Sequence, residues 1–328
     1  MKSIEAQFIL RAASPIVQKQ KTAGNVGILN RTPVVLNDGS IREIAEVTGN
    51  AMRNGLRRAA ALLILDSLGL LQGKQFDSPD AVRFLFNGGG GSGSDNTLRI
   101  DDVRAMNALI PSTALFGGCT KGMIHFGRLE VAPATLICEE TLPDLAPWQR
   151  DAVGGITIHP SVVYEYRQDN FQHDETVKPL GRFLLTEAAQ RKLDERLRKR
   201  EGASDTGDVV AAEEAKGGMR PYATQAIKRG SLFTWSVVGH VEDEIQEATF
   251  HAILSAFLRR PVVGSGRSVG RGRFEVFAVK DFDHLRPAEV MRERDPSSVT
   301  DPGLEKVFTD YILSRGDEVK EWLRSVQA

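Results

Sequence analysis

The hydrophobic pattern of the chain first indicates a set of strands. From Ser3 to Ala13 apolar and polar residues alternate, which predicts a half-buried strand that ends at Ser14-Pro15. Similar runs predict strands over roughly residues 123–138 and from Pro221 to Val241, with a turn at 229–231. A last core strand is expected from Arg273 to Val279.

Two segments have the helical period instead. The apolar positions of the first helix, which is expected to begin near Val47, share one narrow arc: Met52, Leu56, Ala59 and Leu63. Its polar positions share the opposite arc: Asn50, Arg53, Asn54 and Arg57. Beyond Ala60 this helix is apolar nearly all round, so we expect its second half to be buried and its first half to be partly exposed, with the basic residues in the exposed part. A second amphipathic helix is predicted from Glu242 to Arg259 and is ended by Pro261.

The order strand, helix, strands, strand, helix, strand predicts an α+β fold with a ferredoxin-like or RRM-like core. We expect one elaborated domain over residues 1–328, with insertions at about 14–46, 70–111 and 142–220 and a helical extension at about 285–328. The first insertion is expected to be a long polar connection. The second is expected to hold two short helices around a Gly-Ser run, and the third a hairpin near Ile156 to Tyr166. A single helix is expected from Leu304 to Val326.

The composition is typical of a folded protein and gives no sign of a membrane segment or a cofactor. The 328 residues are 41% hydrophobic and 26% charged, and no stretch reaches the roughly 20 apolar residues that a membrane helix needs. The first residues lack the apolar run of a signal peptide. Two cysteines, Cys119 and Cys138, form no CxxC pair, so we expect reduced thiols, a cytoplasmic location, no metal and no cofactor.

The charge of the chain is segregated although its formal net value is only −1. Residues 1–74 and residues 216–280 each carry ten basic and five acidic side chains, whereas residues 139–215 carry ten and sixteen. A near-neutral chain argues against indiscriminate binding to nucleic acid. Two basic blocks still indicate a shaped electropositive surface.

The first candidate site is the start of the first helix, from Thr48 to Arg58. Thr48 or Asn50 is placed to cap the helix, whose free N–H groups and arginine side chains favour an anion such as phosphate. The alternative is a solvated surface on which the arginines pair with Glu43 and Glu46.

Two glycine-rich segments are further candidates. Residues 264–272 interleave glycines with Arg267 and Arg271, which allows close approach to a phosphodiester, although the spacing matches neither a Walker loop nor a dinucleotide fingerprint. The alternative is a mobile hairpin. Residues 116–122 form a tight Phe-Gly turn from which Lys121 would reach a phosphate, or they are simply a turn.

Taken in order, these segments resemble the RAMP superfamily of CRISPR proteins, in which a ferredoxin-like palm carries a Gly- and Arg-bearing first helix, a Phe-Gly turn and a late Gly-rich loop. The segment 226–233 matches the strand pair before the second helix, and the resemblance touches about half of the chain. Its size and its insertions are similar to the Cas seven family, with a type IV system as the nearest match and a type I variant next. The 142–220 insertion then corresponds to part of a thumb, and the others to finger-like elements.

This resemblance implies an RNA-binding backbone subunit rather than an enzyme. Such subunits oligomerise along a CRISPR guide RNA (crRNA), in a Cascade-like antiviral defence complex, and present its bases for target pairing. The implied partners are crRNA, target nucleic acid (DNA before RNA), copies of the chain, and other effector subunits, namely a Cas five-like protein, a large subunit and a helicase. The expected RNA-binding residues are Asn50, Arg53, Asn54, Arg57, Arg58, Lys121, Arg220, Arg267 and Arg271. Candidates for wedging between bases are Phe183, Met219 and Tyr222, for which a core position is the alternative.

Catalysis is the competing function. Type III relatives cut target RNA with an aspartate in a loop after the first strand, and Asp38 lies in the corresponding loop. Asn-Asp-Gly is also ordinary turn chemistry, and no second carboxylate stands at an evident metal-sharing position. Three histidines, His125, His159 and His173, are conceivable general bases, but the sequence pairs none of them with a second acid or base.

Overall fold

The computed structural model describes ten stretches of the chain: residues 1–23, 26–36, 38–71, 79–89, 100–120, 123–161, 163–170, 220–264, 270–280 and 300–325. Its contacts divide the chain into two compact units. The first comprises Met1–Gln20, Leu29–Tyr164 and Ala226–Ala328, and the second comprises Lys21–Ile28 and Glu165–Gln225.

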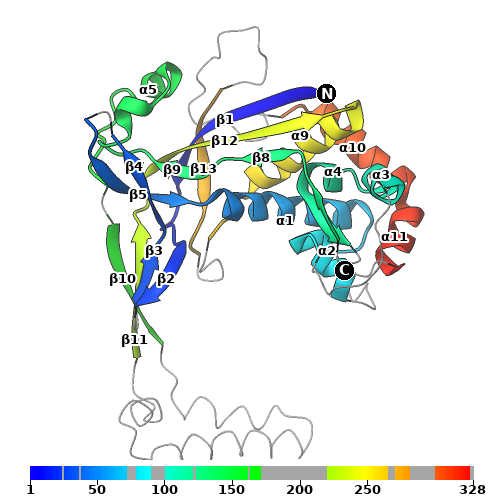
Figure 1. The fold of residues 1–328 in the computed structure, drawn as a ribbon, viewed down its shortest axis with the longest axis horizontal. Coiled ribbons are helices and arrows are strands. Elements are labelled where there is room, and N and C mark those ends of the chain that lie inside the picture. Colours follow the sequence, from blue (N-terminus) through cyan, green and yellow to red (C-terminus); the bar gives the residue numbers. More distant parts are fainter. Residues whose placement is uncertain are drawn as a thin grey trace, which may run out of the picture. The chain divides into compact units, whose positions relative to one another are not determined.

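A seven-stranded sheet forms the centre of the first unit, in the order β13-β1-β12-β9-β5-β4, with β8 also paired to β12 (Figure 1). The strands of this sheet are β1 (Lys2–Ala12), β4 (Arg31–Val35), β5 (Ile41–Val47), β8 (Leu129–Val131), β9 (Ala134–Leu136), β12 (Leu232–Val241) and β13 (Phe274–Lys280). Adjacent strands pair antiparallel, as in the register Phe8↔Trp235 and Phe8↔Val279.

The predicted ferredoxin-like core is confirmed by this order. In the chain, β1 is followed by helix α1 (Gly49–Ser67), the interrupted strand β8 and β9, strand β12, helix α9 (Glu244–Arg259) and strand β13. In the sheet these four strand positions lie as fourth, first, third and second. Each helix therefore crosses between two parallel strands that have one antiparallel strand between them.

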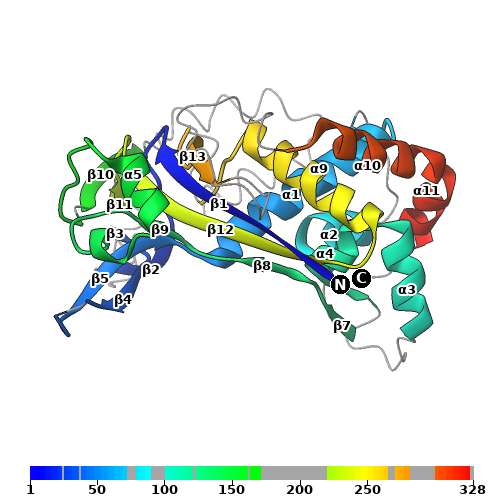
Figure 2. The same ribbon diagram turned by 90° about the horizontal axis from the view of Figure 1, so that it is seen from above.

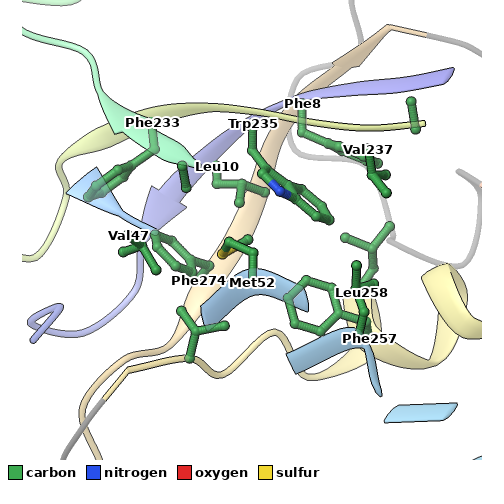
Figure 3. Close-up of a cluster of buried hydrophobic side chains, with 14 of the residues drawn as sticks. Phe8, Leu10, Val47, Met52, Phe233, Trp235, Val237, Phe257, Leu258 and Phe274 are labelled. Atoms are coloured by element: carbon green, nitrogen blue, oxygen red, sulfur yellow. The ribbon is translucent and has the colours of Figure 1, made fainter. Parts of the chain in front are cut away.

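Both core helices cover one face of this sheet. Met52 of α1 and Phe257 of α9 pack beneath Phe8 and Trp235 (Figure 3). The Phe8 and Trp235 rings stack with centroids 5.1 Å apart, and the Trp235 and Phe257 rings lie 5.6 Å apart. The alternating residues of β1 and β12 therefore point to the helices at every second position, as the sequence pattern predicted.

A smaller apolar cluster lies on the opposite face of the sheet. There Ile9, Leu232 and Phe277 pack with Leu145 and with helix α5 (Pro147–Val153), which follows the 3₁₀ turn Leu142–Asp144. Helix α5 lies on the other side of the strands from α1 and α9 (Figures 1 and 2). It covers only part of this face.

Four further helices, the second half of α1, and Ala248 and Ala252 of α9 make another apolar cluster. These helices are α2 (Pro79–Asn87), α3 (Ile100–Leu109), α10 (Pro302–Ser314) and α11 (Gly316–Ser325), while α4 (Ser112–Phe116) joins the main core. The buried second half of α1 and the two helices α2 and α3 agree with the prediction. The prediction of a single C-terminal helix was wrong, because α10 ends at Ser314 and α11 begins at Gly316.

The long polar connection expected at 14–46 was also wrong. This segment contains four strands: β2 (Lys19–Ala23), β3 (Val26–Leu29), β4 and β5. Strand β4 lies at the edge of the sheet, where Pro33 interrupts no ladder on its outer side. Because β4 and β5 expose several polar or solvent-facing positions and bury few residues, such as Ile44, Ala45 and Val47, the segment lacked a clear alternating signal.

The second unit is described through a four-stranded sheet of order β10-β11-β3-β2, in which β10 is Val163–Asn170 and β11 is Arg220–Ile227. Strands β11 and β3 run parallel, with Ala223 opposite Val26. The hairpin predicted near Ile156 to Tyr166 is not formed, because the one strand here, β10, pairs with β11 instead. Within the described stretches no helix is long and apolar enough to span a bilayer.

Candidate nucleic-acid interface

The first helix begins at a tightly packed cap. The Thr48 hydroxyl accepts the Ala51 N–H at 3.3 Å, and the Gln18 side chain both donates to that hydroxyl at 2.5 Å and accepts the Thr48 N–H at 2.9 Å. A Cβ on Gly49 would lie 2.4 Å from the Val131 carbonyl oxygen, so this position admits only glycine without a shift of backbone. Thr48, rather than Asn50, caps the helix.

Arg53 and Arg57 do not form a free cationic face. Arg53 donates from Nη1 to the Leu129 carbonyl at 2.6 Å and from Nη2 to the Phe116 carbonyl at 2.7 Å. Arg57 donates from Nη2 to the Phe116 carbonyl at 2.9 Å and to the Gly117 carbonyl at 3.4 Å. Both guanidinium groups also lie over the Phe116 ring, at 5.9 and 5.3 Å from its centroid. Both side chains are partly exposed, as expected, but their donors bind backbone carbonyls, and neither arginine pairs with Glu43 or Glu46 as the alternative supposed.

The two arginines, Phe116 and Gly117 form what we call the arginine clamp. It joins α1 to the Phe-Gly turn that opens the hairpin of β6 (Gly117–Thr120) and β7 (Met123–Phe126). Gly88, at the end of α2, fits against it because a Cβ there would lie 1.7 Å from Arg57 Nη1. Two of the segments singled out in the sequence therefore meet in space.

The arginine clamp holds positive charge without a counter-charge. Among the described residues, no carboxylate pairs with either arginine, and the hydrogen-bond acceptors of both are neutral backbone carbonyls. Burial, and after it the charge of Arg53, lower the pKa of Arg57 to about 10, while burial alone lowers that of Arg53. Half-buried cations that lie close together without an opposite charge favour an anionic ligand.

The exposed surface beside the clamp is a polar stripe on α1. Asn50, Asn54 and Arg58 recur every four residues and face solvent. We call these three residues the α1 stripe. Among the described members of the predicted set, they are the ones whose side chains are exposed rather than partly exposed.

The neck of the Gly-rich loop lies against the same helix. Gly272 donates its N–H to the Pro15 carbonyl at 2.9 Å, and Val263 donates to the Gly272 carbonyl at 2.8 Å. A Cβ on Gly55 of α1 would lie 3.1 Å from the Val263 side chain, so helix and loop neck are in contact. Gly264 and Gly272 both have positive φ angles, of 77° and 79°. The loop is thus anchored next to α1 on the side away from the clamp.

Several predicted residues remain without a structural account. Lys121, Phe183, Met219 and Arg267 lie outside the described residues, and the side chains of Arg220 and Tyr222, on strand β11, do as well. Arg271, in the loop neck, is partly exposed and takes part in interactions. These RNA-binding and base-wedge assignments stay predictions.

Asp38 occupies a turn at the tip of the β4–β5 hairpin. Its carboxylate accepts the Ser40 N–H at 2.8 Å, and the hydrogen bonds from Ser40 lower its pKa. In the part of the chain that the structure describes, no three His, Cys, Asp or Glu side chains gather as metal ligands. The geometry of Asp38 is that of an Asx turn.

Sequence reasoning missed the exposed apolar ribbon formed by β6 and β7. Ile124 is 72% exposed and Phe126 is 91% exposed, and both lie on one face of β7 because they are two residues apart. Opposite them on β6 stand only Cys119 and Gly117. The run Met-Ile-His-Phe reads as a buried strand in the sequence, so its exposure carried no sequence signal.

Of the comparisons with known proteins, the one with solved structures finds matches in fold. No family model matches the chain, and no curated protein sequence matches it. A chain from a solved structure described as a Type IV-B CRISPR Complex aligns with a TM-score of 0.52 over 90% of this chain and 97% of that one. The two chains share a fold. At 17% sequence identity, the match shows the arrangement of elements and nothing finer.

The uncompensated charge of the arginine clamp predicts stabilisation by anions. Inorganic phosphate at millimolar concentration should raise the thermal midpoint of the protein by about 1–2 °C, because a ligand that binds only the folded state stabilises it. In Arg57→Met this increment should disappear. The matched control is Arg104→Met on α3, where Arg104 is exposed and pairs with Asp101. Equal increments in the wild type and Arg57→Met would contradict the clamp as an anion site.

The pKa of His125 predicts acid sensitivity. Burial, and then the charge of Arg57, lower this pKa below its usual value near 6.5, and neither ring nitrogen has a hydrogen-bond partner among the described residues. As pH falls through 6.5 the unfolded chain takes up this proton first, so stability is full above that pH and declines below it. Urea unfolding at pH 7.5 and 5.0 should show a smaller pH difference for His125→Leu than for the wild type. The exposed His159→Leu should keep the wild-type difference; if both variants do, His125 has no such role.

Proposed function

We propose that this chain binds a CRISPR guide RNA along its sugar-phosphate backbone, as a Cas seven-like RAMP subunit of a class 1 effector complex. The observation that carries the proposal is the arginine clamp, two half-buried guanidinium groups without a carboxylate partner among the described residues. Phosphate is the anion that arginine forks match best. The shared fold with a chain of a Type IV-B CRISPR complex supports the proposal and favours a type IV-like assignment.

The surface around the clamp fits contacts to a backbone rather than to bases. Asn50, Asn54 and Arg58 line the exposed side of α1, whereas the glycine neck of the 264–272 loop contacts the helix at Gly55, away from the clamp. Amide, guanidinium and close backbone contacts position a nucleic acid without reading its sequence. A guide-presenting protein requires this division, because the bases must stay free for pairing with a target, for which we propose DNA.

The proposal includes no cleavage step. The Asp38 carboxylate accepts a hydrogen bond from the N–H of Ser40, and the described residues form no metal-ligand cluster around it. A metal-dependent ribonuclease would need such a cluster. We propose a binding subunit on the strength of the arginine clamp.

The experiment that tests RNA binding uses the α1 stripe, because these side chains are exposed and do not support the fold. Asn54→Glu combined with Arg58→Glu should weaken binding of a single-stranded CRISPR repeat RNA by at least about tenfold at moderate salt, measured by fluorescence anisotropy. The matched control, Lys306→Glu, reverses an exposed charge on α10 and should bind as the wild type does. The proposal would be refuted if the wild type did not bind the RNA at low salt, or if the double substitution left its binding unchanged.

The apolar ribbon supports the proposed protein partners, which are copies of this chain and other effector subunits. Large exposed apolar side chains gathered on one rigid face mark protein contacts. The base of this ribbon is fixed, since Gly117 and Gly127 pack so closely that a Cβ on either would meet backbone within 2.5 Å. A preformed ribbon costs little ordering entropy on docking.

Replacing both ribbon side chains should separate assembly from RNA binding. Ile124→Ser with Phe126→Ser should reduce assembly of the complex on guide RNA, followed by light scattering, with anisotropy of the isolated subunit on short RNA unchanged. The control Leu313→Ser removes a 55% exposed leucine on α10 and should assemble normally. Unaltered assembly by the double variant would remove the ribbon from the interface.

A further inference from the structure

A groove of about 450 Å³ opens on the face of the central sheet opposite α1 and α9. It lies wholly in the first unit, between the sheet, residues 141–149 and Val34 of the edge strand β4. Its volume falls in the range of small-ligand sites. None of the three sequence candidates lies in it.

The floor of the groove is a row of neutral hydrogen-bonding side chains from three adjacent strands. Gln7 of β1 stands opposite Ser236 of β12, and Thr234 of β12 stands opposite Thr135 of β9. Among the described residues, the hydroxyl groups of Thr135, Thr234 and Ser236 have no hydrogen-bond partner. Three hydroxyl groups are therefore available to a ligand in an otherwise paired sheet.

The amide of Gln7 is held in place by its neighbours. Its Oε1 accepts the Trp148 Nε1–H at 3.1 Å, and its Nε2 donates to the Glu5 carboxylate at 2.7 Å. The amide keeps one N–H and one lone pair for a further bond. Helix α5, which carries Trp148, thereby fixes one end of the floor.

The charge of the lining determines which ligands fit. Among the described residues, no lysine, arginine or histidine lines the groove, and Asp144 is the one charged side chain of that lining. The remaining walls are apolar, formed by residues such as Val34, Pro133 and Leu145. Phosphates and carboxylates are disfavoured here, since they would meet a carboxylate and no cation. An uncharged ring with donors and acceptors on its edge fits.

A peptide fits this floor less well than a base does. Extended peptides bind through main-chain hydrogen bonds at a sheet edge, whereas the floor strands β1, β12 and β9 already pair with one another. A nucleobase instead presents donors and acceptors on its edge, and hydroxyl groups can serve as either. Hydroxyl groups therefore accommodate any of the bases without selecting among them.

We propose that this groove binds an uncharged nucleobase, from a free nucleoside or from an RNA bound to the same chain. The free-nucleoside form stands independently, whereas the RNA form rests on the proposed function. In the second case the groove takes one base out of the guide without reading its identity, while phosphates are held elsewhere on the chain.

The first test uses uridine and adenosine as probes of the full chain, by saturation-transfer NMR and titration. Both should bind with similar affinity, and uridine monophosphate should bind no more tightly, because the lining has no cation. Thr234→Val with Ser236→Ala removes two hydroxyl groups at nearly constant shape and should weaken binding about tenfold or more. The control Thr309→Val removes a hydroxyl on α10 and should change nothing.

Failure of this idea is distinguishable from failure of RNA binding. RNA with abasic positions should bind the wild type more weakly than intact RNA, and the groove double variant should lose that preference. Nucleoside binding without RNA binding would refute the proposed function and keep the groove. Three outcomes would overturn the groove proposal while RNA binding remains: no binding of either nucleoside, binding of glucose alone, or nucleoside binding that the double variant keeps.

Discussion

The two arginines of α1 bind backbone carbonyls and so join three parts of the described molecule. Their guanidinium groups close the free edge of β8 at Leu129 and fix the Phe-Gly turn at Phe116, which places the β6–β7 ribbon and the end of α2 against the first helix. A neutral side chain would satisfy these carbonyls less completely. The cost is a pair of positive charges in a partly desolvated place, which an anion would relieve.

The two faces of the central sheet have different chemistry. The face toward α1 and α9 is sealed by aromatic and aliphatic side chains around Phe8 and Trp235. The other face is only partly covered by α5, which leaves a neutral, hydroxyl-lined groove. Positive charge and uncharged polar groups are thus separated: the two arginines lie on the helix beside the sheet, and the hydroxyl groups lie on its open face. A protein that binds a phosphodiester chain while leaving most bases free has use for such a separation.

The sequence by itself determined the core of the fold. Alternation in β1 directs Phe8 and Leu10 to the helices, and the arc of Met52 and Leu56 faces them from α1. The order of these elements then gave the ferredoxin-like topology. The sequence pattern did not predict the strands of residues 14–46, because they bury few residues. It also did not predict the end of the helix near Arg315, because no proline marks it.

Only the tertiary structure decided what the candidate residues do. The sequence correctly placed Arg53 and Arg57 on the arc of α1 opposite its core, but a helical wheel cannot show that a turn some sixty residues later supplies carbonyl partners on that arc. The exposure of Phe126 and the groove above Thr234 likewise come from contacts between segments far apart in the chain. Local periodicity indicates which face of an element is apolar. Which neighbour covers that face depends on long-range packing, and the locations of the candidate sites depend on it as well.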